Sequence, residues 1–113
     1  MSDRIDGFAW DAGNEAKCER HGLTRPAIEA FFLAGPRVAP DAAHSVAEQR
    51  FIAVGRIPAG QEGEGRAAFV AFTIREVGGA RLIRPISARF MHAKEVRRYE
   101  DFEAEEGSRS ADG

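Results

Sequence analysis

Alternating hydrophobic and polar positions in the second half of the chain predict three β-strands. They cover residues 50–56, 67–75 and 81–88, where side chains repeat with the period of two that is typical of a half-buried sheet. A tight glycine turn at 78–79 joins the last two strands into a hairpin. Pro85 has no backbone N–H to donate to a sheet ladder, so we expect a bulge or an outward-facing amide there.

Hydrophobic positions three and four residues apart predict three helices. The first covers residues 13–20 behind an N-cap at Asp11, and the second begins after a cap at Thr24, because short polar side chains accept hydrogen bonds from the first free N–H groups of a helix. Gly35 ends the second helix. The third is expected over residues 91–102, with an apolar stripe along one side.

Length and composition indicate one globular domain. The 113 residues are 43% hydrophobic and 30% charged, enough to bury a single modest core. We expect that domain over residues 1–106, with short extended segments at 8–10 and 38–40, and a disordered tail over 107–113. The single cysteine, Cys18, excludes an internal disulfide and is expected in helix packing. A polar N-terminus and the lack of a long apolar run predict a cytoplasmic protein.

The net charge of −2 conceals two unlike parts of the chain. Residues 100–113 contain six acidic side chains and one basic one, whereas residues 1–99 contain 15 basic and 12 acidic side chains. The expected folded part is therefore positive although the whole chain is acidic. An acidic isoelectric point argues less strongly against a nucleic acid partner when the acids gather at one end.

The segment from residue 75 to residue 98 is the most cationic part of the chain. Two acids, Glu76 and Glu95, oppose seven cations there: Arg75, Arg81, Arg84, Arg89, Lys94, Arg97 and Arg98. A cationic strand that leads into a cationic helix suits a polyanion such as RNA. The alternative is a solvated helix face with scattered surface arginines.

The residue types available restrict the possible chemistry. The sequence contains no P-loop, no dinucleotide-binding glycine motif, no HExxH motif and no zinc-ligand spacing of cysteine and histidine. Arginine, lysine, histidine and glutamate remain, and they are sufficient for RNA cleavage without a metal or other cofactor. The ribose 2′-hydroxyl then serves as the nucleophile, and the protein supplies a base, a proton donor and cations for the phosphorane.

Several short motifs occur in a fixed order between residues 8 and 100. They read FAWD at 8–11, KCERHG at 17–22, His44-Ser45 with Glu48 and Arg50, Gly55, TIR at 73–75, ISAR at 86–89, and Lys94-Glu95 with Tyr99-Glu100. In this order the motifs resemble the BrnT family, the ribonuclease toxins of BrnT/BrnA type II toxin–antitoxin systems. Departures include Arg20 before His21, where lysine is common, and Pro85 before the ISAR piece.

The resemblance implies a small α+β domain with a RelE-like fold. In that fold, an antiparallel β-sheet packs against N-terminal helices and a C-terminal helix. The resemblance also implies an RNA substrate and a BrnA-like antitoxin with a ribbon-helix-helix region, through which the pair would bind DNA and repress its own operon. The alternative is a catalytically inactive, toxin-like module that only binds its antitoxin and assists repression.

Arg89 and Arg75 are predicted as the catalytic cations that bind the reacting phosphate. Arg89 lies where a strand ends and a helix opens, and Arg75 ends the adjacent strand, so we expect the two side chains to lie beside each other. Planar guanidinium groups match phosphate oxygens. The alternatives are an ion pair between Arg89 and a carboxylate such as Glu95, and a plain surface position for Arg75.

Proton transfer is assigned to a histidine and a glutamate. His21 is predicted to donate a proton near neutral pH, or otherwise to cap its helix, and Lys17 one turn earlier is predicted to bind RNA phosphate. Glu48 and Arg50 lie two residues apart on extended chain and share a face. They are read as a base and a phosphate ligand, or as a mutual structural pair.

The last helix is predicted to contact RNA through Lys94 and Arg98, with solvated side chains as the alternative. Tyr99 is read mainly as a brace between helix and sheet, and less readily as a platform on which a base stacks. His44 and His92 are weaker candidates, because a histidine in a loop usually has no special role.

Overall fold

A five-stranded mixed sheet organises the molecule, in the strand order β1-β5-β4-β3-β2. The structure is a computed structural model that describes residues 4–44 and 48–112. Its strands are β1 (Gly7–Phe8), β2 (Arg37–Pro40), β3 (Phe51–Arg56), β4 (Ala67–Val77) and β5 (Ala80–Phe90). Its helices are α1 (Ala12–Glu19), α2 (Arg25–Leu33), the 3-10 turn η1 (Ala42–His44) and α3 (Ala93–Asp112).

The predicted α+β class and the three long strands are confirmed, and the fully antiparallel sheet is wrong at one edge. Strand β1 pairs parallel to β5, with Gly7 opposite Leu82. A two-residue strand is too short to show a direction in its sequence pattern. The bulge expected at Pro85 is confirmed: Phe72 pairs with Pro85 and Ala71 pairs with Ser87, so one β5 residue between them has no partner on β4.

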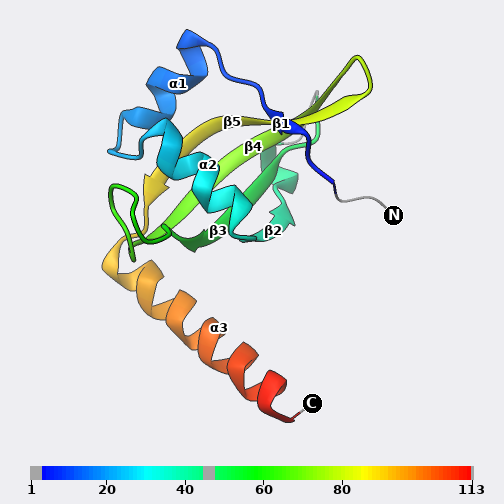
Figure 1. Ribbon diagram of the computed structural model, residues 1–113. Coiled ribbons are helices and arrows are strands. Elements are labelled where there is room, and N and C mark those ends of the chain that lie inside the picture. The colour runs from blue at the N-terminus through cyan, green and yellow to red at the C-terminus, as the bar shows by residue number, and fades with distance from the viewer. Residues whose placement is uncertain (1–3, 45–47, 113) are drawn as a thin grey trace.

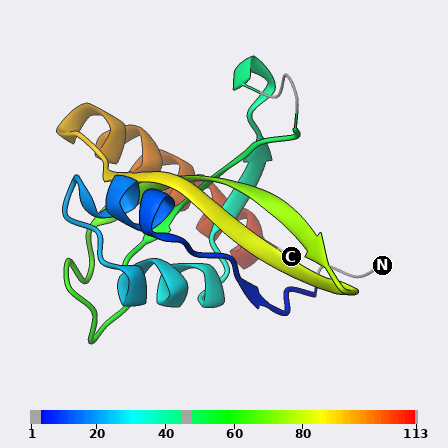
Figure 2. The ribbon, with the colours of Figure 1, turned by 90° about the horizontal axis from the view of Figure 1, so that it is seen from above.

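Helices α1 and α2 cover one face of the sheet, and the core lies between them and that face (Figures 1 and 2). Fully buried side chains from both layers meet there, among them Cys18, Leu23, Ile28, Phe31 and Val70. We refer to the opposite side as the outer face. α3 leaves the end of β5 toward that side and projects from the body.

A capping box fixes the start of α1. The Asp11 carboxylate accepts a hydrogen bond from the Asn14 backbone N–H at 2.9 Å, and the Asn14 side chain accepts one from the Asp11 N–H at 2.7 Å. The Asn14 amide, 5% exposed, also donates to the carbonyl oxygens of Ala9 and Pro85. One buried side chain therefore joins the first turn of α1 to the middle of β5.

α3 extends well past its predicted end at Phe102. It begins at Ala93 and continues to Asp112. Two outer-face arginines hold its second half: Arg56 forms an ion pair with Glu103 at 3.0 Å, and Arg37 forms one with Glu106. The single-domain boundary at 106 and the disordered tail stay predictions. No helix in the described part of the chain is long and apolar enough to cross a membrane.

The glycine-rich loop between β3 and β4 packs against Phe90 at the end of β5. Gly63 has a φ of +88°, and a Cβ atom there would lie 2.7 Å from the Phe90 ring. Gly65 in the same loop has a φ of +82° with no atom within 4 Å of such a Cβ. Both backbones lie in the left-handed region that favours glycine, but the loop touches Phe90 closely only at Gly63.

Gly63→Ala should therefore destabilise the protein more than Gly65→Ala. A left-handed backbone lowers the free energy of unfolding by about 1–2 kcal/mol when the residue has a Cβ atom, and this cost applies to both variants. Only Gly63→Ala adds a clash with the Phe90 ring. We expect a total loss of roughly 2–3 kcal/mol for Gly63→Ala against about 1 kcal/mol for Gly65→Ala, measured by urea unfolding. Equal losses would contradict the close packing of loop and ring.

Candidate functional site

The junction between β5 and α3 is organised by one bidentate ion pair. Both terminal nitrogens of Arg89 donate to the two carboxylate oxygens of Glu95 at 2.9 Å each, and the guanidinium lies over the Phe69 ring at 4.6 Å. The backbone N–H of His92 donates to the same carboxylate at 2.8 Å, which caps the start of α3. Strand end, helix start and guanidinium are therefore held as one unit.

This arrangement shifts the ionisation of both partners. The hydrogen bonds from Arg89 and from the His92 N–H lower the pKa of Glu95 to about 2. The hydrogen bond to Glu95 in turn raises the pKa of Arg89. Glu95 is thus a poor proton acceptor at neutral pH, whereas Arg89 is permanently charged and oriented. The ion pair with Glu95, which was the alternative to a catalytic role for Arg89, is present. A guanidinium has five N–H donors, so some of them remain for another anion.

Phe90, at the end of β5, contacts both the turn after α1 and the glycine-rich loop between β3 and β4. Its ring lies against Gly22, in the turn after α1, and against Gly63, and the Arg66 guanidinium lies over it at 3.6 Å. His21 is exposed and directly precedes Gly22. The turn with His21, the glycine loop and the start of α3 gather at one end of the molecule (Figure 1).

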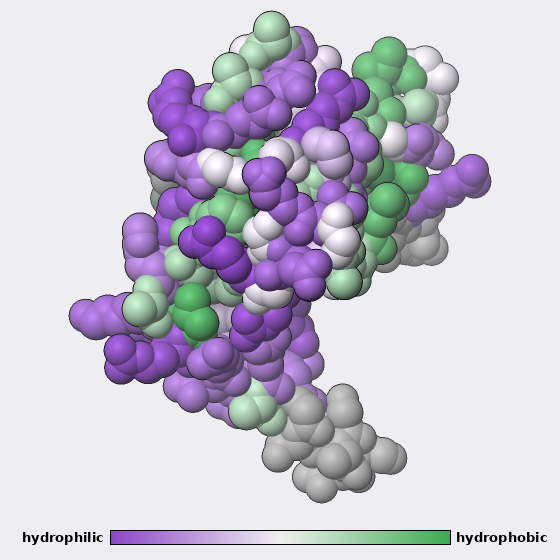
Figure 3. Space-filling model, turned by 60° about the vertical axis from the view of Figure 1, so that its left-hand side comes forward, coloured by the Kyte–Doolittle hydropathy of each residue, from purple (hydrophilic) through white to green (hydrophobic). Residues whose placement is uncertain are grey.

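Cations without an ion-pair partner among the described residues surround this end. They are Lys17, Arg20, Lys94, Arg97 and Arg98, and all five are exposed. Figure 3 brings this side forward and shows mostly hydrophilic residues along α3 and where it meets the body. An exposed cation that no carboxylate neutralises is available to a polyanion. The junction therefore combines a fixed guanidinium with a basic surface.

The prediction that Arg75 lies beside Arg89 is wrong. Arg89 pairs with Phe69 across the β4–β5 ladder, whereas Arg75 pairs with Leu82. Six strand residues separate these positions along β4, which corresponds to roughly 20 Å. In an antiparallel hairpin the end of one strand meets the beginning of the next, so two strand-end residues lie at opposite ends of the hairpin.

The remaining predicted residues divide between the two ends of the hairpin. Glu48 forms an ion pair with Arg75 at 3.4 Å. Arg50 directly precedes β3, and its carbonyl oxygen accepts a hydrogen bond from the Asp41 N–H. Glu48, Arg75 and Arg50 therefore lie toward the hairpin turn. The other predicted residues, His21, Lys17, Lys94 and Arg98, lie toward the opposite end. The His44 side chain and Ser45 lie outside the described residues.

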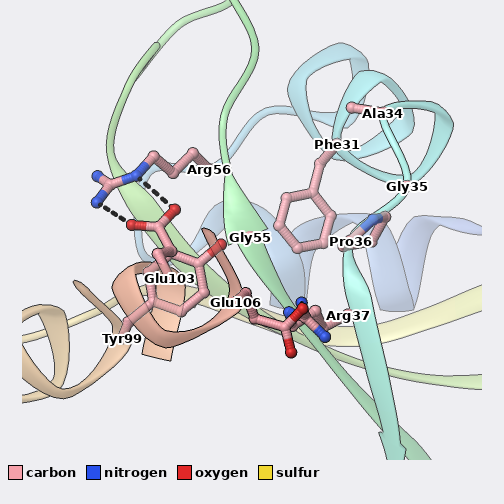
Figure 4. A pocket seen from close by; sticks show the side chains of 10 residues that line it. All are labelled: Phe31, Ala34, Gly35, Pro36, Arg37, Gly55, Arg56, Tyr99, Glu103 and Glu106. Atoms are coloured by element: carbon pink, nitrogen blue, oxygen red, sulfur yellow. Dashed lines mark hydrogen bonds and ion pairs between the residues drawn. The ribbon is translucent and has the colours of Figure 1, made fainter. Parts of the chain in front are cut away.

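Sequence reasoning missed Arg37 and Arg56, which bind α3 to the sheet. Arg56 lies over the Tyr99 ring at 5.5 Å and Arg37 lies over Phe102 at 4.6 Å, each beside the carboxylate that it binds. Figure 4 shows Arg56 hydrogen-bonded to Glu103 and Arg37 beside Glu106, and these four residues line part of a pocket of about 610 Å³. The hydrogen bond to Glu103 raises the pKa of Arg56. A usable signal was present in the sequence, since acids at 103 and 106 repeat with helical spacing.

Other polar groups do not form a second centre. Burial raises the pKa of the Cys18 thiol to about 11, which suits a packing role and not a nucleophile. Within the described residues, no three histidine, cysteine, aspartate or glutamate side chains gather as a group that could hold a metal ion. The fold and the junction thus define a small α+β protein with one cationic end.

Comparison with known families identifies the chain further. The family described as "Ribonuclease toxin, BrnT, of type II toxin-antitoxin system" matches residues 10–95. This match covers most of the 113 residues, so the chain belongs to the BrnT family of toxins. The resemblance seen in the sequence motifs is confirmed. No curated protein matches the chain.

The Arg89–Glu95 pair makes a specific prediction about acid stability. Because folding lowers the pKa of Glu95 from 4.5 to about 2, its stabilising effect is complete above about pH 4.5 and is lost as the pH falls toward 2. The difference in free energy of unfolding between wild type and Glu95→Gln should therefore shrink across that interval. Urea unfolding at a series of pH values measures it, and a difference that does not change with pH would contradict the pairing.

Proposed function

We propose that this chain is a metal-independent endoribonuclease toxin that binds and cleaves RNA at the β5–α3 junction. Membership of a ribonuclease toxin family supports the reaction class. The single observation that carries the location is Arg89, which Glu95 and the Phe69 ring hold in place amid cations that have no ion-pair partner in the described part of the chain. A guanidinium fixed before substrate arrives can stabilise developing phosphorane charge without reorganising.

The proposed reaction uses the RNA as its own nucleophile. The 2′-oxygen forms a bond to phosphorus as its proton passes to a base, and the bond from phosphorus to the 5′-oxygen breaks. His21 gives a proton to that leaving oxygen. The products are a 2′,3′-cyclic phosphate and a free 5′-hydroxyl. Arg89 binds the pentavalent phosphorus oxygens, while Lys17, Lys94 and Arg98 bind neighbouring phosphates.

Arg75, Glu48 and Arg50 take no part in that step under this proposal. Arg75 is separated from Arg89 by roughly 20 Å, which is too far for both to contact one phosphate. Glu48 pairs with Arg75 near the hairpin turn, so the proposal leaves the base unassigned and treats the Glu48–Arg75 ion pair as a structural contact.

The finer parts of the family resemblance belong to the same proposal. We infer a RelE-like arrangement, since helices cover one sheet face and α3 follows the last strand. The antitoxin is BrnA-like, with a ribbon-helix-helix region that binds operator DNA for the pair. The toxin acts in the cytoplasm, where its RNA substrate is found.

A catalytically inactive toxin-like module is the second candidate. The observation that favours it is the Arg89–Glu95 pair itself, because the central guanidinium already has an anion. Such a protein would bind its antitoxin and assist operon repression without cleaving RNA. Growth arrest on expression without antitoxin favours the enzyme, and harmless expression of a folded chain favours the module.

Two arginines with similar surroundings test the location of the site. Arg89 and Arg75 are about equally exposed, 40% and 49%, and each pairs with a glutamate. In excess chelator, Arg89→Ala should lose roughly 100-fold or more of the RNA cleavage rate, whereas Arg75→Ala should stay within about threefold of wild type. Arg89→Lys separates charge from the planar fork and should also be strongly impaired.

The outcomes separate the parts of the proposal. Cleavage that stops in chelator overturns metal independence, and products with a 5′-phosphate overturn the 2′-hydroxyl mechanism. If Arg75→Ala is the inactive variant, the site lies at the other end of the hairpin. Thermal unfolding of each variant shows whether a loss reflects folding, since a destabilised Arg89→Lys would make the residue structural.

A further inference from the structure

A groove on the outer face lies between α3 and strands β2 to β4. Its volume is about 530 Å³, and it adjoins the polar pocket drawn in Figure 4, with which it shares Arg37 and Tyr99. Its walls are mostly apolar, with Ile52, Val54 and Phe69 from the strands and Phe102 from the helix. Concave apolar surface with a few polar groups at its rim is typical of a binding site.

One large side chain at the groove is exposed to an unusual degree: Phe102 on α3 is 44% exposed. Ala39 on β2, also exposed, pairs with the groove residue Ile52 across the sheet. Aromatic and branched apolar side chains at the edge of a groove are typical anchors of protein interfaces. RNA offers phosphates and flat bases, and the aliphatic part of the wall, Ile52 and Val54, matches neither the charge of the former nor the hydrogen-bonding edges of the latter.

The charge around the groove indicates the chemistry of its occupant. Arg98 lines the groove, and Lys94 and Arg97 lie within one helical turn of it. None of the three has an ion-pair partner among the described residues. Glu95, the acid that lines the groove, is engaged already by Arg89. An occupant that fits must bring apolar side chains with carboxylates beside them.

We propose that this groove is the docking site of the antitoxin, through a segment whose apolar side chains enter the groove and whose acidic side chains meet Lys94, Arg97 and Arg98. The inference rests on the proposed function, since a toxin of a type II system has a protein antitoxin. A second copy of this chain fits less well, because the acidic half of α3 is held by its own Arg37 and Arg56.

This docking site explains how one partner would neutralise the toxin. Lys94 and Arg98 are also the cations assigned to RNA, and Phe69, which carries the Arg89 guanidinium, forms part of the groove wall. A segment seated there would neutralise the phosphate-binding cations of α3 and cover one side of the junction. Antitoxin and RNA would then compete for the same face of α3.

The test uses glutamate substitutions at exposed apolar positions. Phe102→Glu and Ala39→Glu place a charge in the groove, and Leu33→Glu, at an 81% exposed position at the end of α2, is the matched control. The probe is the protein encoded by the reading frame next to that of this chain, purified and titrated by calorimetry. Both groove variants should bind on the order of 100-fold more weakly, and Leu33→Glu should change the Kd by less than about threefold.

RNA cleavage by the same variants keeps this inference separate from the proposed function. Groove variants that cleave RNA within about threefold of wild type but escape the antitoxin support both. Lost antitoxin binding without any RNA cleavage in wild type supports the groove and overturns the enzyme. Unchanged antitoxin binding in both groove variants overturns the groove, as does a wild-type chain that fails to bind the probe. If Phe102→Glu alters the attachment of α3, antitoxin binding by Ala39→Glu alone tests the groove.

The inference is also overturned if the groove variants keep antitoxin binding and lose a different property. If both groove variants convert a dimer of the isolated chain into a monomer in sedimentation and still bind the probe normally, the occupant is a second copy. If they lose RNA cleavage and keep the antitoxin, the groove belongs to RNA.

Discussion

Arginine–carboxylate pairs between the outer face of the sheet and α3 determine where the functional surface lies. Arg89, Arg56 and Arg37 bind Glu95, Glu103 and Glu106 in turn, so one strand end and two further strands each hold one part of the helix. Exposed ion pairs contribute only about 0–1 kcal/mol each. Bidentate hydrogen bonds and the aromatic rings beneath the guanidinium groups fix the orientation of the arginine side chains. The proposed site depends on that fixed orientation more than on the energy of the pairs.

The helix therefore has two halves with different roles. In its second half, Glu103 and Glu106 pair with the protein's own Arg56 and Arg37. In its first half, Lys94, Arg97 and Arg98 have no ion-pair partner in the described part of the chain. The cationic end of the molecule, the proposed RNA site and the apolar groove all border that first half. A toxin and its antidote would thus use one helix, which accounts for mutual exclusion without a change of fold.

Local patterns predicted much of this fold. Caps at Asp11 and Thr24 start their helices as expected, and the Pro85 bulge follows from proline's missing N–H. Long-range geometry was harder to predict from local patterns. The neighbours of Arg75 depend on the direction of the paired strands. The length of α3 depends on contacts with Arg37 and Arg56, which lie far earlier in the sequence. The arginine–glutamate pair at the junction was foreseen only as an alternative, because charge alone does not distinguish a ligand site from an ion pair.

The central claim is that RNA is bound at the β5–α3 junction, and a crystal structure with RNA tests it most directly. An oligonucleotide whose 2′-hydroxyls are replaced by methoxy groups cannot be cleaved by the proposed route and would remain intact in the crystal. We predict a phosphate within hydrogen-bond distance of the Arg89 guanidinium, with the strand following Lys94 and Arg98. A phosphate held instead by Arg75 and Arg50, with Arg89 bound only to Glu95, would contradict the account.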